Sequence, residues 1–475
     1  MKQTKIVASI SDRRCDTEFI RALFNAGMNV VRMNTAHAPE EGIRQIVKNV
    51  REVSHHIGIL IDTKGPEVRT TACAEPIQYK TGDVVKIFGR PEVETTHDIV
   101  NVTYKNFAAD LHEGCHILFD DGALDMQVIG INGPQITAQV KNDGVLGSRK
   151  SVNVPGIHID LPALTEKDRK NIMLAIELDI DFIAHSFVRS AADVRAVQAI
   201  LDAYNSDIKI ISKIENQEGV DNIDEIIEAS YGIMIARGDL GIEVPIERIP
   251  GIQRRIIRKC VQAKKPVIVA TQMLHSMIQN PRPTRAEVTD IANAIYYRTD
   301  ALMLSGETAA GAFPVEAVQM MAEICRKAES HLSERDTYHT GENRRNVSDI
   351  TGFLAVQAAK HSGAKALLCP TLGGRTARIM SSFRPRLPII ATSPDEATLR
   401  RCCFYWGVSA VLATEQPDVR RVCTDALRQA TANGLLQRGD VTVITAGDPL
   451  SSPMAQEDGV TTETPTNIMV IAEAF

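Results

Sequence analysis

The first two-thirds of the chain alternates short apolar runs with amphipathic stretches of helical period. Eight runs have the length of buried strands, at residues 5–10, 28–34, 58–62, 181–187, 209–214, 232–236, 266–271 and 301–304. Helical patterns accompany most of them, at 17–26, 165–178, 191–204, 222–229, 253–263, 285–296 and 315–331. Continuous apolar strands separated by helices are typical of a parallel sheet that is buried on both faces. Eight such units predict an α/β fold with a closed (β/α)₈ TIM barrel, and periodicity alone leaves a doubly wound open sheet as the alternative.

The third βα unit is interrupted by residues of a different pattern. Short strands are predicted at 84–88, 98–102, 116–119, 126–131, 135–140 and 151–154, and turn pairs such as Asp121-Gly122 and Asn132-Gly133 separate them. These features predict an all-β insert, a small β-barrel over 70–158, between barrel segments 1–69 and 159–335. Because βα loops lie at the catalytic face of such barrels, the insert is expected to act as a lid.

A polar stretch at 336–346 is predicted to be a linker. Alternation then resumes, with strands predicted at 364–369, 387–392, 408–414, 440–445 and 468–475 and helices at 349–361, 375–383, 395–405 and 418–431. Residues 347–475 are therefore expected to form a C-terminal open α/β domain.

Composition narrows the functional class of the protein. The chain has 475 residues, 44% of them hydrophobic, and a net charge of -6 without a basic block, which argues against nucleic-acid and membrane-surface partners. Neither a secretory signal nor an apolar run of membrane-spanning length is visible. Nine irregularly spaced cysteines indicate free thiols in a reducing compartment. A cytoplasmic enzyme is the expectation.

The segment Ile211-Ser-Lys-Ile-Glu-Asn216, followed one unit later by Ala236-Arg-Gly-Asp-Leu-Gly241, carries the clearest chemical signal. Residues two apart on a strand point to the same side, so Lys213 and Glu215 emerge together. Asp239 follows the next strand, and the three side chains converge if the strands are neighbours. Two carboxylates beside one ammonium can hold Mg²⁺ and present a positive charge to an anionic substrate. A structural ion-pair cluster is the alternative for either segment alone, and both segments in order favour the metal site.

Polar residues suited to phosphate chemistry follow nearly every predicted barrel strand. They are Arg32, Asn34, Asp62, Thr63, Lys64, Glu67, Arg69, Ser186, Phe187, Arg237, Gly238, Thr271, Gln272, Ser305, Gly306 and Glu307. The carboxyl ends of (β/α)₈ strands meet at one face, so these residues are expected to share a site. Several cations with at least two acids suit a phosphorylated, carboxylated substrate bound with a divalent metal.

Several ordered segments also match one known family. They are Asp62-Thr-Lys-Gly-Pro-Glu-Val-Arg69, Leu161-Pro-Ala-Leu-Thr-Glu-Lys-Asp168, 211–216, 236–241, Ala270-Thr-Gln-Met-Leu274, Asn280-Pro-Arg-Pro-Thr-Arg-Ala-Glu287 and Met303-Leu-Ser-Gly-Glu-Thr308. On these segments the chain resembles the pyruvate kinases along nearly its whole length. The resemblance implies transfer of a phosphoryl group from phosphoenolpyruvate to ADP, giving pyruvate and ATP in the last step of glycolysis. It also implies a regulatory C-terminal domain and a homotetramer.

The resemblance assigns roles by motif position. Glu215 and Asp239 would hold Mg²⁺ or Mn²⁺, and Lys213 would neutralise the transferring phosphoryl group. Further roles are implied for Arg32 (phosphate), Ser186 and Phe187 (substrate), Ala236, Arg237, Gly238 and Thr271 (substrate carboxylate), Thr271 and Ser305 (enolate protonation), and Arg69, His37, Asn34 and Lys167 (nucleotide). For Ser305 an ordinary strand-end serine is the alternative, and for His37 a structural histidine.

The resemblance further implies a K⁺ site at Asn34, Asp62 and Thr63, and Glu67 is the residue type of K⁺-requiring members. One expected ligand departs, because the chain has Ala36 where the family usually has serine. A methyl group cannot coordinate a cation, so either another group completes the shell or K⁺ binds more weakly.

Other departures lie near the nucleotide and the effector. Residues 9–12 and Ala310 differ from the family pattern beside the expected base and ribose, and His185 and His275 are treated as packing variants. The loop residues Thr371, Gly373, Gly374, Arg375 and Thr376 are the candidate site of a phosphorylated effector, since backbone N–H groups at a helix start suit phosphate. A plain βα turn is the alternative, and a polar insertion at 451–464 prevents transfer of effector identity.

Two other functional classes remain open at this point. A different Mg²⁺-enolate barrel enzyme, such as a lyase or aldolase, would share the metal carboxylates but would not need Arg69, Lys167 or a lid. A non-catalytic metabolite sensor would be expected to lose Lys213 or one of the metal ligands. The sequence keeps Lys213, Glu215 and Asp239.

Overall fold

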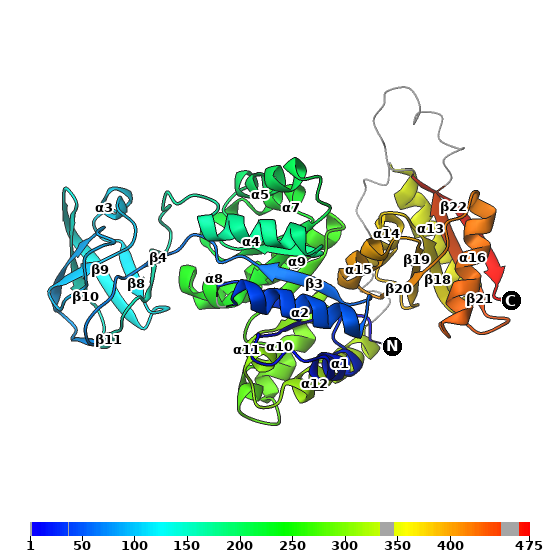
Figure 1. Cartoon of the computed structure of the whole chain (residues 1–475), viewed down its shortest axis with the longest axis horizontal. Helices are drawn as coiled ribbons and strands as arrows, with labels where there is room; N and C mark the ends of the chain where they lie inside the picture. Colours follow the sequence, from blue (N-terminus) through cyan, green and yellow to red (C-terminus); the bar gives the residue numbers. More distant parts are fainter. Residues whose placement is uncertain (1, 37, 333–345, 448–464) are drawn as a thin grey trace, which may run out of the picture.

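The computed structural model describes residues 2–36, 38–332, 346–447 and 465–475. The molecule is elongated, with the all-β insert at one end, the barrel in the middle and the C-terminal domain at the other end (Figure 1). The predicted linker, 336–346, lies almost wholly outside the described residues, as do His37 and the insertion 451–464.

Eight parallel strands form the closed barrel in the order β1-β17-β16-β15-β14-β13-β3-β2, which confirms the (β/α)₈ prediction over the open sheet. Their bounds are β1 Lys5–Ser9, β2 Val30–Asn34, β3 Gly58–Asp62, β13 Phe182–His185, β14 Lys209–Ile214, β15 Gly232–Ala236, β16 Val267–Ala270 and β17 Ala301–Leu304. The surrounding helices are α1 Thr17–Ala26, α2 Glu40–Val53, α4 Glu166–Glu177, α5 Ala191–Ala203, α6 Gln217–Asp221, α7 Ile223–Ala229, α8 Arg237–Glu243, α9 Ile249–Gln262, α10 Arg285–Tyr296, α11 Gly306–Ala309 and α12 Pro314–Ser330, with 3₁₀ turns at Ile246–Arg248 and His275–Ile278.

The alternation of side chains along each strand separates two cores. One set, including Val7, Leu60 and Ile211, fills the barrel interior. The neighbouring positions, including Ile6 and Ile59, pack outward against the helices. Because the strands are buried on both faces, their sequences are continuous apolar runs. The interior position two residues after this apolar layer lies at the carboxyl end of the strand.

The insert is an all-β domain, as predicted. Its strands are β4 Val68–Arg69, β5 Ile77–Tyr79, β6 Val84–Phe88, β7 Ile99–Asn101, β8 His116–Phe119, β9 Leu124–Asn132, β10 Gln135–Val140, β11 Gly144–Leu146 and β12 Ser151–Asn153, with the short helix α3 Phe107–Asp110. Seven strands form one sheet in the order β4-β12-β8-β9-β10-β6-β7, and a bridge from Thr70 to Val102 joins its two edges. The sequence pattern missed β4, β5 and β11, which are too short to show an alternation.

The C-terminal domain is a five-stranded sheet in the order β20-β19-β18-β21-β22, in which only β22 is antiparallel. Its elements are α13 Val347–His361, β18 Ala366–Pro370, α14 Arg375–Ser382, β19 Ile389–Ser393, α15 Glu396–Arg401, a 3₁₀ turn at Cys402–Phe404, β20 Val408–Leu412, α16 Val419–Ala432, β21 Val441–Gly447 and β22 Thr466–Glu473. Figure 1 shows α13 and α16 on opposite sides of this sheet.

Aromatic side chains join this domain to the amino-terminal end of the barrel. Phe404 belongs to the barrel-interior cluster and meets Phe182 edge-on, with ring centroids 4.5 Å apart. Tyr405 hydrogen-bonds through its hydroxyl to Tyr231, which precedes β15. The barrel is therefore closed at this end by the C-terminal domain, and only the opposite end is open to a substrate.

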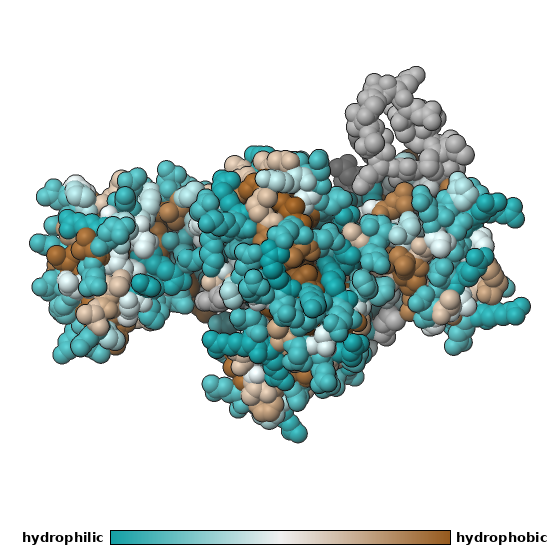
Figure 2. Space-filling view, in the orientation of Figure 1, coloured by the Kyte–Doolittle hydropathy of each residue, from teal (hydrophilic) through white to brown (hydrophobic). Residues whose placement is uncertain are grey.

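Hydrophilic residues cover most of the face shown in Figure 2, and the brown apolar areas are small and separated. Within the described residues, no helix combines the length and the apolar character that crossing a membrane requires.

Candidate active site

The carboxyl end of the barrel gathers charged and polar side chains from four strands. Arg32, Asp62, Lys213 and Ser186 occupy interior positions just beyond the apolar layer, and Glu215 follows on the same side as Lys213. Asp62 Oδ2 accepts from Arg32 Nε at 2.7 Å, and Asp62 Oδ1 lies 3.2 Å from Lys213 Nζ. Lys213 Nζ also lies 2.9 Å from Glu215 Oε1 and donates to Ser186 Oγ at 2.7 Å. The structure thus brings Lys213 and Glu215 together, as the two-residue period of a strand predicted.

The balance of charge in this cluster has an excess of acid. Asp62 and Glu215 are buried, and Asp239 is close enough to influence Glu215 and Lys213 electrostatically. Although burial opposes it, Asp62 and Glu215 raise the pKa of Lys213, so its ammonium stays charged. Burial, which outweighs the attraction of Lys213, raises the pKa of Glu215 to about 7. Three carboxyl groups face two cations, and the raised pKa of Glu215 reflects this excess of acid, which a bound cation would stabilise.

The donor set fits a divalent metal that shares its shell with substrate. Glu215 comes from the end of β14, and Asp239 lies in the first turn of α8 and lines the adjoining cleft. No cluster of three or more His, Cys, Asp or Glu side chains suited to a metal occurs among the described residues. Two carboxylates with remaining positions for water and substrate oxygens are what Mg²⁺ takes in phosphoryl-transfer sites.

The backbone that holds Glu215 and the neighbouring loop is strained. The backbone N–H of Phe187 donates to Glu215 Oε2 at 2.7 Å, and Phe187 has a φ of 55°. Thr271 and Gln272 have φ values of 68° and 54° at the end of β16. Non-glycine residues in the left-handed region concentrate at functional sites, where the surrounding structure must hold them.

Thr271 and the start of α8 form the second part of the site. Thr271 Oγ1 accepts from the backbone N–H of Gly238 at 2.8 Å and donates to Ala270 O at 2.6 Å. The Arg237 guanidinium pairs with Asp290 at 2.6 Å and donates to the backbone carbonyl of Thr271 at 2.7 Å. The first turn of α8 therefore offers backbone N–H groups, whereas the Arg237 side chain has a structural partner that the sequence did not indicate.

Ser305 lies at the end of β17 beside a buried acid. Glu307 accepts from the backbone N–H groups of Ser305 at 2.8 Å and Leu274 at 3.1 Å. These bonds tie the ends of β16 and β17 together. Glu307 thus orients the Ser305 backbone, a role that no spacing in the sequence distinguishes.

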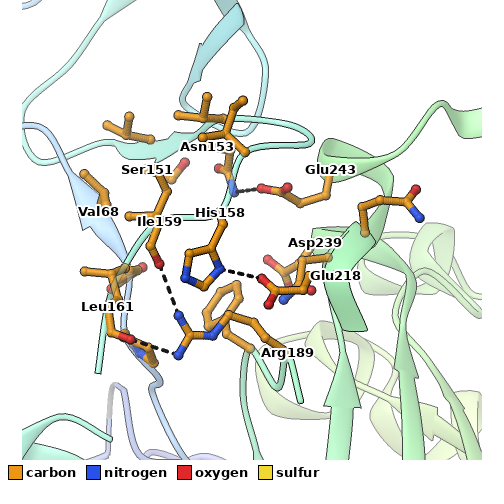
Figure 3. Close-up of a pocket in the computed structure, with 18 of the residues that line it drawn as sticks. Val68, Ser151, Asn153, His158, Ile159, Leu161, Arg189, Glu218, Asp239 and Glu243 are labelled. Atoms are coloured by element: carbon orange, nitrogen blue, oxygen red, sulfur yellow. Dashed lines mark hydrogen bonds and ion pairs between the residues drawn. The ribbon is translucent and has the colours of Figure 1, made fainter. Parts of the chain in front are cut away.

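A cleft of about 510 Å³ separates the barrel end from the insert. Asp239 and Phe187 line it from the barrel, and Glu67 and Arg69 from the connection to the insert. Figure 3 shows two contacts across it: Asn153 donates to Glu243 at 2.9 Å, and His158 pairs with Glu218 at 2.8 Å. The insert therefore contacts the carboxyl end of the barrel at helices α6 and α8.

Residues predicted for the nucleotide and K⁺ lie around the same end. Arg69 pairs with Glu67 at 2.8 Å, and Lys167 Nζ donates to Ala36 O at 3.1 Å. Asn34 Oδ1 accepts from the Ala36 backbone N–H at 3.0 Å. Thr63 accepts through Oγ1 from the Ser186 N–H at 3.0 Å, which joins β3 to β13. His37 lies outside the described residues.

The loop at 371–376 is held mainly by local contacts. Gly374 has a φ of 82°, and its N–H donates to Thr371 Oγ1 at 3.0 Å. Thr376 is buried, and its hydroxyl meets that of Thr466 on β22 at 2.9 Å. The hydroxyl of Thr376 is thus engaged by β22, a contact that the sequence did not indicate.

Comparison with known proteins gives a single family. Residues 1–318 match the family model described as "Pyruvate kinase, barrel domain", and residues 350–471 match "Pyruvate kinase, alpha/beta domain". A pyruvate kinase of Borreliella burgdorferi is 46% identical over 94% of both chains, and one of Geobacillus stearothermophilus is 43% identical over 94% of this chain and 78% of its own. The crystal structure of a pyruvate kinase from Cryptosporidium parvum superposes with a TM-score of 0.92 at 36% identity, covering all of this chain and 96% of the other. The chain is a phosphotransferase that belongs to the pyruvate kinase family.

Proposed function

We propose that this chain transfers the phosphoryl group of phosphoenolpyruvate to ADP, with a divalent cation at Glu215 and Asp239. The observation that carries the proposal is Lys213, held charged between Asp62 and Glu215 at the carboxyl end of the barrel. A phosphoryl group in transfer spreads negative charge over its oxygens, and a fixed ammonium stabilises that charge. Arg32, whose planar guanidinium suits phosphate oxygens, supplies a second cation.

The first turn of α8 and Thr271 would orient the substrate. The helix start favours a carboxylate through its N–H groups and its dipole, and the Thr271 hydroxyl lies beside Gly238. When bound, Mg²⁺ or Mn²⁺ would polarise the carboxylate and enol oxygens of the substrate. Thr271 and Ser305, on adjacent strands, would pass a proton to the enolate by way of water.

Arg69 and Lys167, with His37 and Asn34, would serve the nucleotide phosphates. Arg69 is half exposed and its partner Glu67 leaves part of the guanidinium open to the cleft. We assign K⁺ to Asn34, Asp62 and Thr63. Asn34 Oδ1 accepts from the Ala36 N–H, and its second lone pair would coordinate the ion.

The division of labour follows the three parts of the chain. The barrel, 1–69 and 159–335, would carry the chemistry, the insert 70–158 would close over it, and the domain 347–475, reached through the linker 336–346, would regulate it through residues 371–376.

We also propose a homotetramer. The antiparallel strand β22 is the sheet edge, and Met469, Val470 and Ile471 are exposed along it. On α13, which packs against β22, Val347, Ile350 and Leu354 are also exposed. Sedimentation of Ile471→Lys, compared with the wild type, tests whether this face joins copies, and an unchanged mass would reject it.

Pyruvate formation from phosphoenolpyruvate, ADP and Mg²⁺ tests the reaction, for wild type and Lys213→Met. Removing a charge-stabilising group is expected to lower kcat about 10³-fold. Lys209→Met is the matched control, because Lys209 lies on the same strand four residues earlier, at the closed end of the barrel. Equal activity of the two variants, or no pyruvate from the wild type with ADP, would reject the proposal.

A further inference from the structure

A second cation-lined cavity, of about 200 Å³, lies at the junction of the barrel and the C-terminal domain. Its barrel side is formed by Gln3, Arg298, Glu329, Ser330 and Leu332, and its other side by Arg384, Arg386 and Trp406. These residues lie at the amino-terminal end of the barrel, opposite the catalytic end. The cavity is therefore separate from the active site.

The charge of the cavity is positive. Three arginines line it against one acid, Glu329, whose carboxylate is already engaged. One oxygen of Glu329 accepts from the Gln3 N–H at 2.9 Å, and the other accepts from the Thr4 N–H and hydroxyl at 2.7 Å. The acid thus fixes the start of β1 and leaves the arginines as the dominant charges.

Arg384 is built into the wall of this cavity. It is 3% exposed, pairs with Asp300 at 2.8 Å and donates to Arg298 O at 3.0 Å. Its Nε is buried and has no hydrogen-bond partner among the described residues. A buried guanidinium N–H without an acceptor is costly, and an anion in the cavity would supply one.

The backbone conformation of two of the arginines indicates that their side chains have a function in the cavity. Arg298 and Arg384 have φ values of 75° and 50°, in the left-handed region where glycine or asparagine costs less. Both are buried. A long charged side chain at such a position, on both sides of one junction, indicates that the side chains are needed there.

We propose that this cavity binds a phosphate dianion, either free inorganic phosphate or a small phosphomonoester, and that the ligand joins the barrel to the C-terminal domain. An arginine N–H forms a charge-assisted hydrogen bond with a phosphate oxygen. Arg384 has its Nε–H left for such a bond, because its two terminal nitrogens are engaged by Ser381, Arg298 O and Asp300. The volume suits an ion or a small ester and is below that of ordinary cofactor sites. Because Arg298 comes from the barrel and Arg384 and Arg386 come from the other domain, one bound anion would contact both.

The chain carries its own reporter for this test. Trp406 is its single tryptophan, and it lines the cavity with the Arg384 guanidinium 5.5 Å from its ring centroid. We would titrate the full chain with inorganic phosphate and, separately, glycerol 3-phosphate, following tryptophan emission at constant ionic strength against chloride. Thermal unfolding at each concentration gives a second readout, since a ligand that binds only the folded state raises the midpoint.

Arg298→Gly and Arg386→Gln are the test variants. The first replaces a left-handed arginine by glycine, and the second removes an exposed side chain, so both are expected to fold. Lys327→Gln is the control, because Lys327 is an exposed cation on α12, the helix that supplies Glu329 and Ser330 to the cavity, and does not itself line the cavity.

We expect saturable emission changes that weaken at least tenfold in both test variants and persist in the control. Saturation by inorganic phosphate identifies the free ion, and saturation by glycerol 3-phosphate alone assigns the cavity to an ester. Saturation by neither, an equal response to chloride, or full retention in both test variants would overturn the proposal.

Discussion

The barrel end and the 371–376 loop are the two places where the sequence indicated phosphate binding, and they are built in opposite ways. At the barrel end Arg32, Asp62, Ser186 and Lys213 come from four strands and hold one another. In the loop Gly374 bonds to Thr371, three residues away. A site assembled from distant strands is coupled throughout, whereas a contiguous loop can change without disturbing the rest of its domain.

The largest effect is expected from Asp62→Asn, which removes the charge that links Arg32 and Lys213. Leaving two buried cations with too little compensating charge should cost about 3–5 kcal/mol of unfolding free energy, measured by urea denaturation. Asp224→Asn is the control, because Asp224 forms an exposed pair with Lys259 and should change stability by less than about 1 kcal/mol. Similar costs for the two variants would show that the barrel-end charges are not coupled.

The next prediction concerns His185, a buried residue near the barrel-end cluster, and the dependence of stability on pH. It is buried, and both of its ring nitrogens lack hydrogen-bond partners among the described residues. Burial lowers the pKa of His185 to about 4. The charges of Lys213 and Arg189 add to this shift, and those of Asp193 and Asp168 oppose it. The unfolded chain binds a proton between pH 6.5 and 4 that the folded chain does not, so stability should fall as pH falls through this window.

His185→Leu should remove up to about 3 kcal/mol of that acid dependence, measured by denaturation at pH 7 and pH 4. His56→Leu, at an exposed position in the barrel, serves as the control. Parallel pH profiles for wild type and His185→Leu would contradict the expectation.

A smaller effect is expected from Gly374→Ala in the loop. A β-carbon there would lie 3.6 Å from the Tyr405 ring, which is ordinary contact, so the cost comes only from the positive φ. That strain should lower stability by about 1 kcal/mol in thermal or urea unfolding. Gly363→Ala, at another positive φ with open space around it, should cost the same. A loss of several kcal/mol from Gly374→Ala alone would show that the loop is coupled as tightly as the barrel end.

The smallest effect is expected from Ala36→Ser, which restores a hydroxyl beside Asn34. If K⁺ binds there, its half-saturating concentration for pyruvate formation should fall roughly threefold, less than 1 kcal/mol. Ala38→Ser, two residues further along, is the control. Indifference of both variants to K⁺ would move the monovalent site elsewhere.

Much of this molecule followed from the order of residues alone. Strands β3, β14, β15 and β17 begin and end where the apolar runs predicted, because a strand buried on both faces must be apolar throughout. The Thr-x-x-Asp spacing of Thr165 and Asp168 is typical of a capping box, and the box is present at the start of α4. The convergence of Lys213 and Glu215 needed only the two-residue period of a strand.

Contacts between distant segments were decided by tertiary structure. Neither the pairing of Arg237 with Asp290 nor the engagement of Thr376 by Thr466 has a local signal, since each joins elements far apart in sequence. The same holds for the junction cavity, where Gln3, Arg298 and Arg384 meet only after both domains have folded. Sequence periodicity fixes which side of an element a residue occupies, and packing between elements decides what that residue meets.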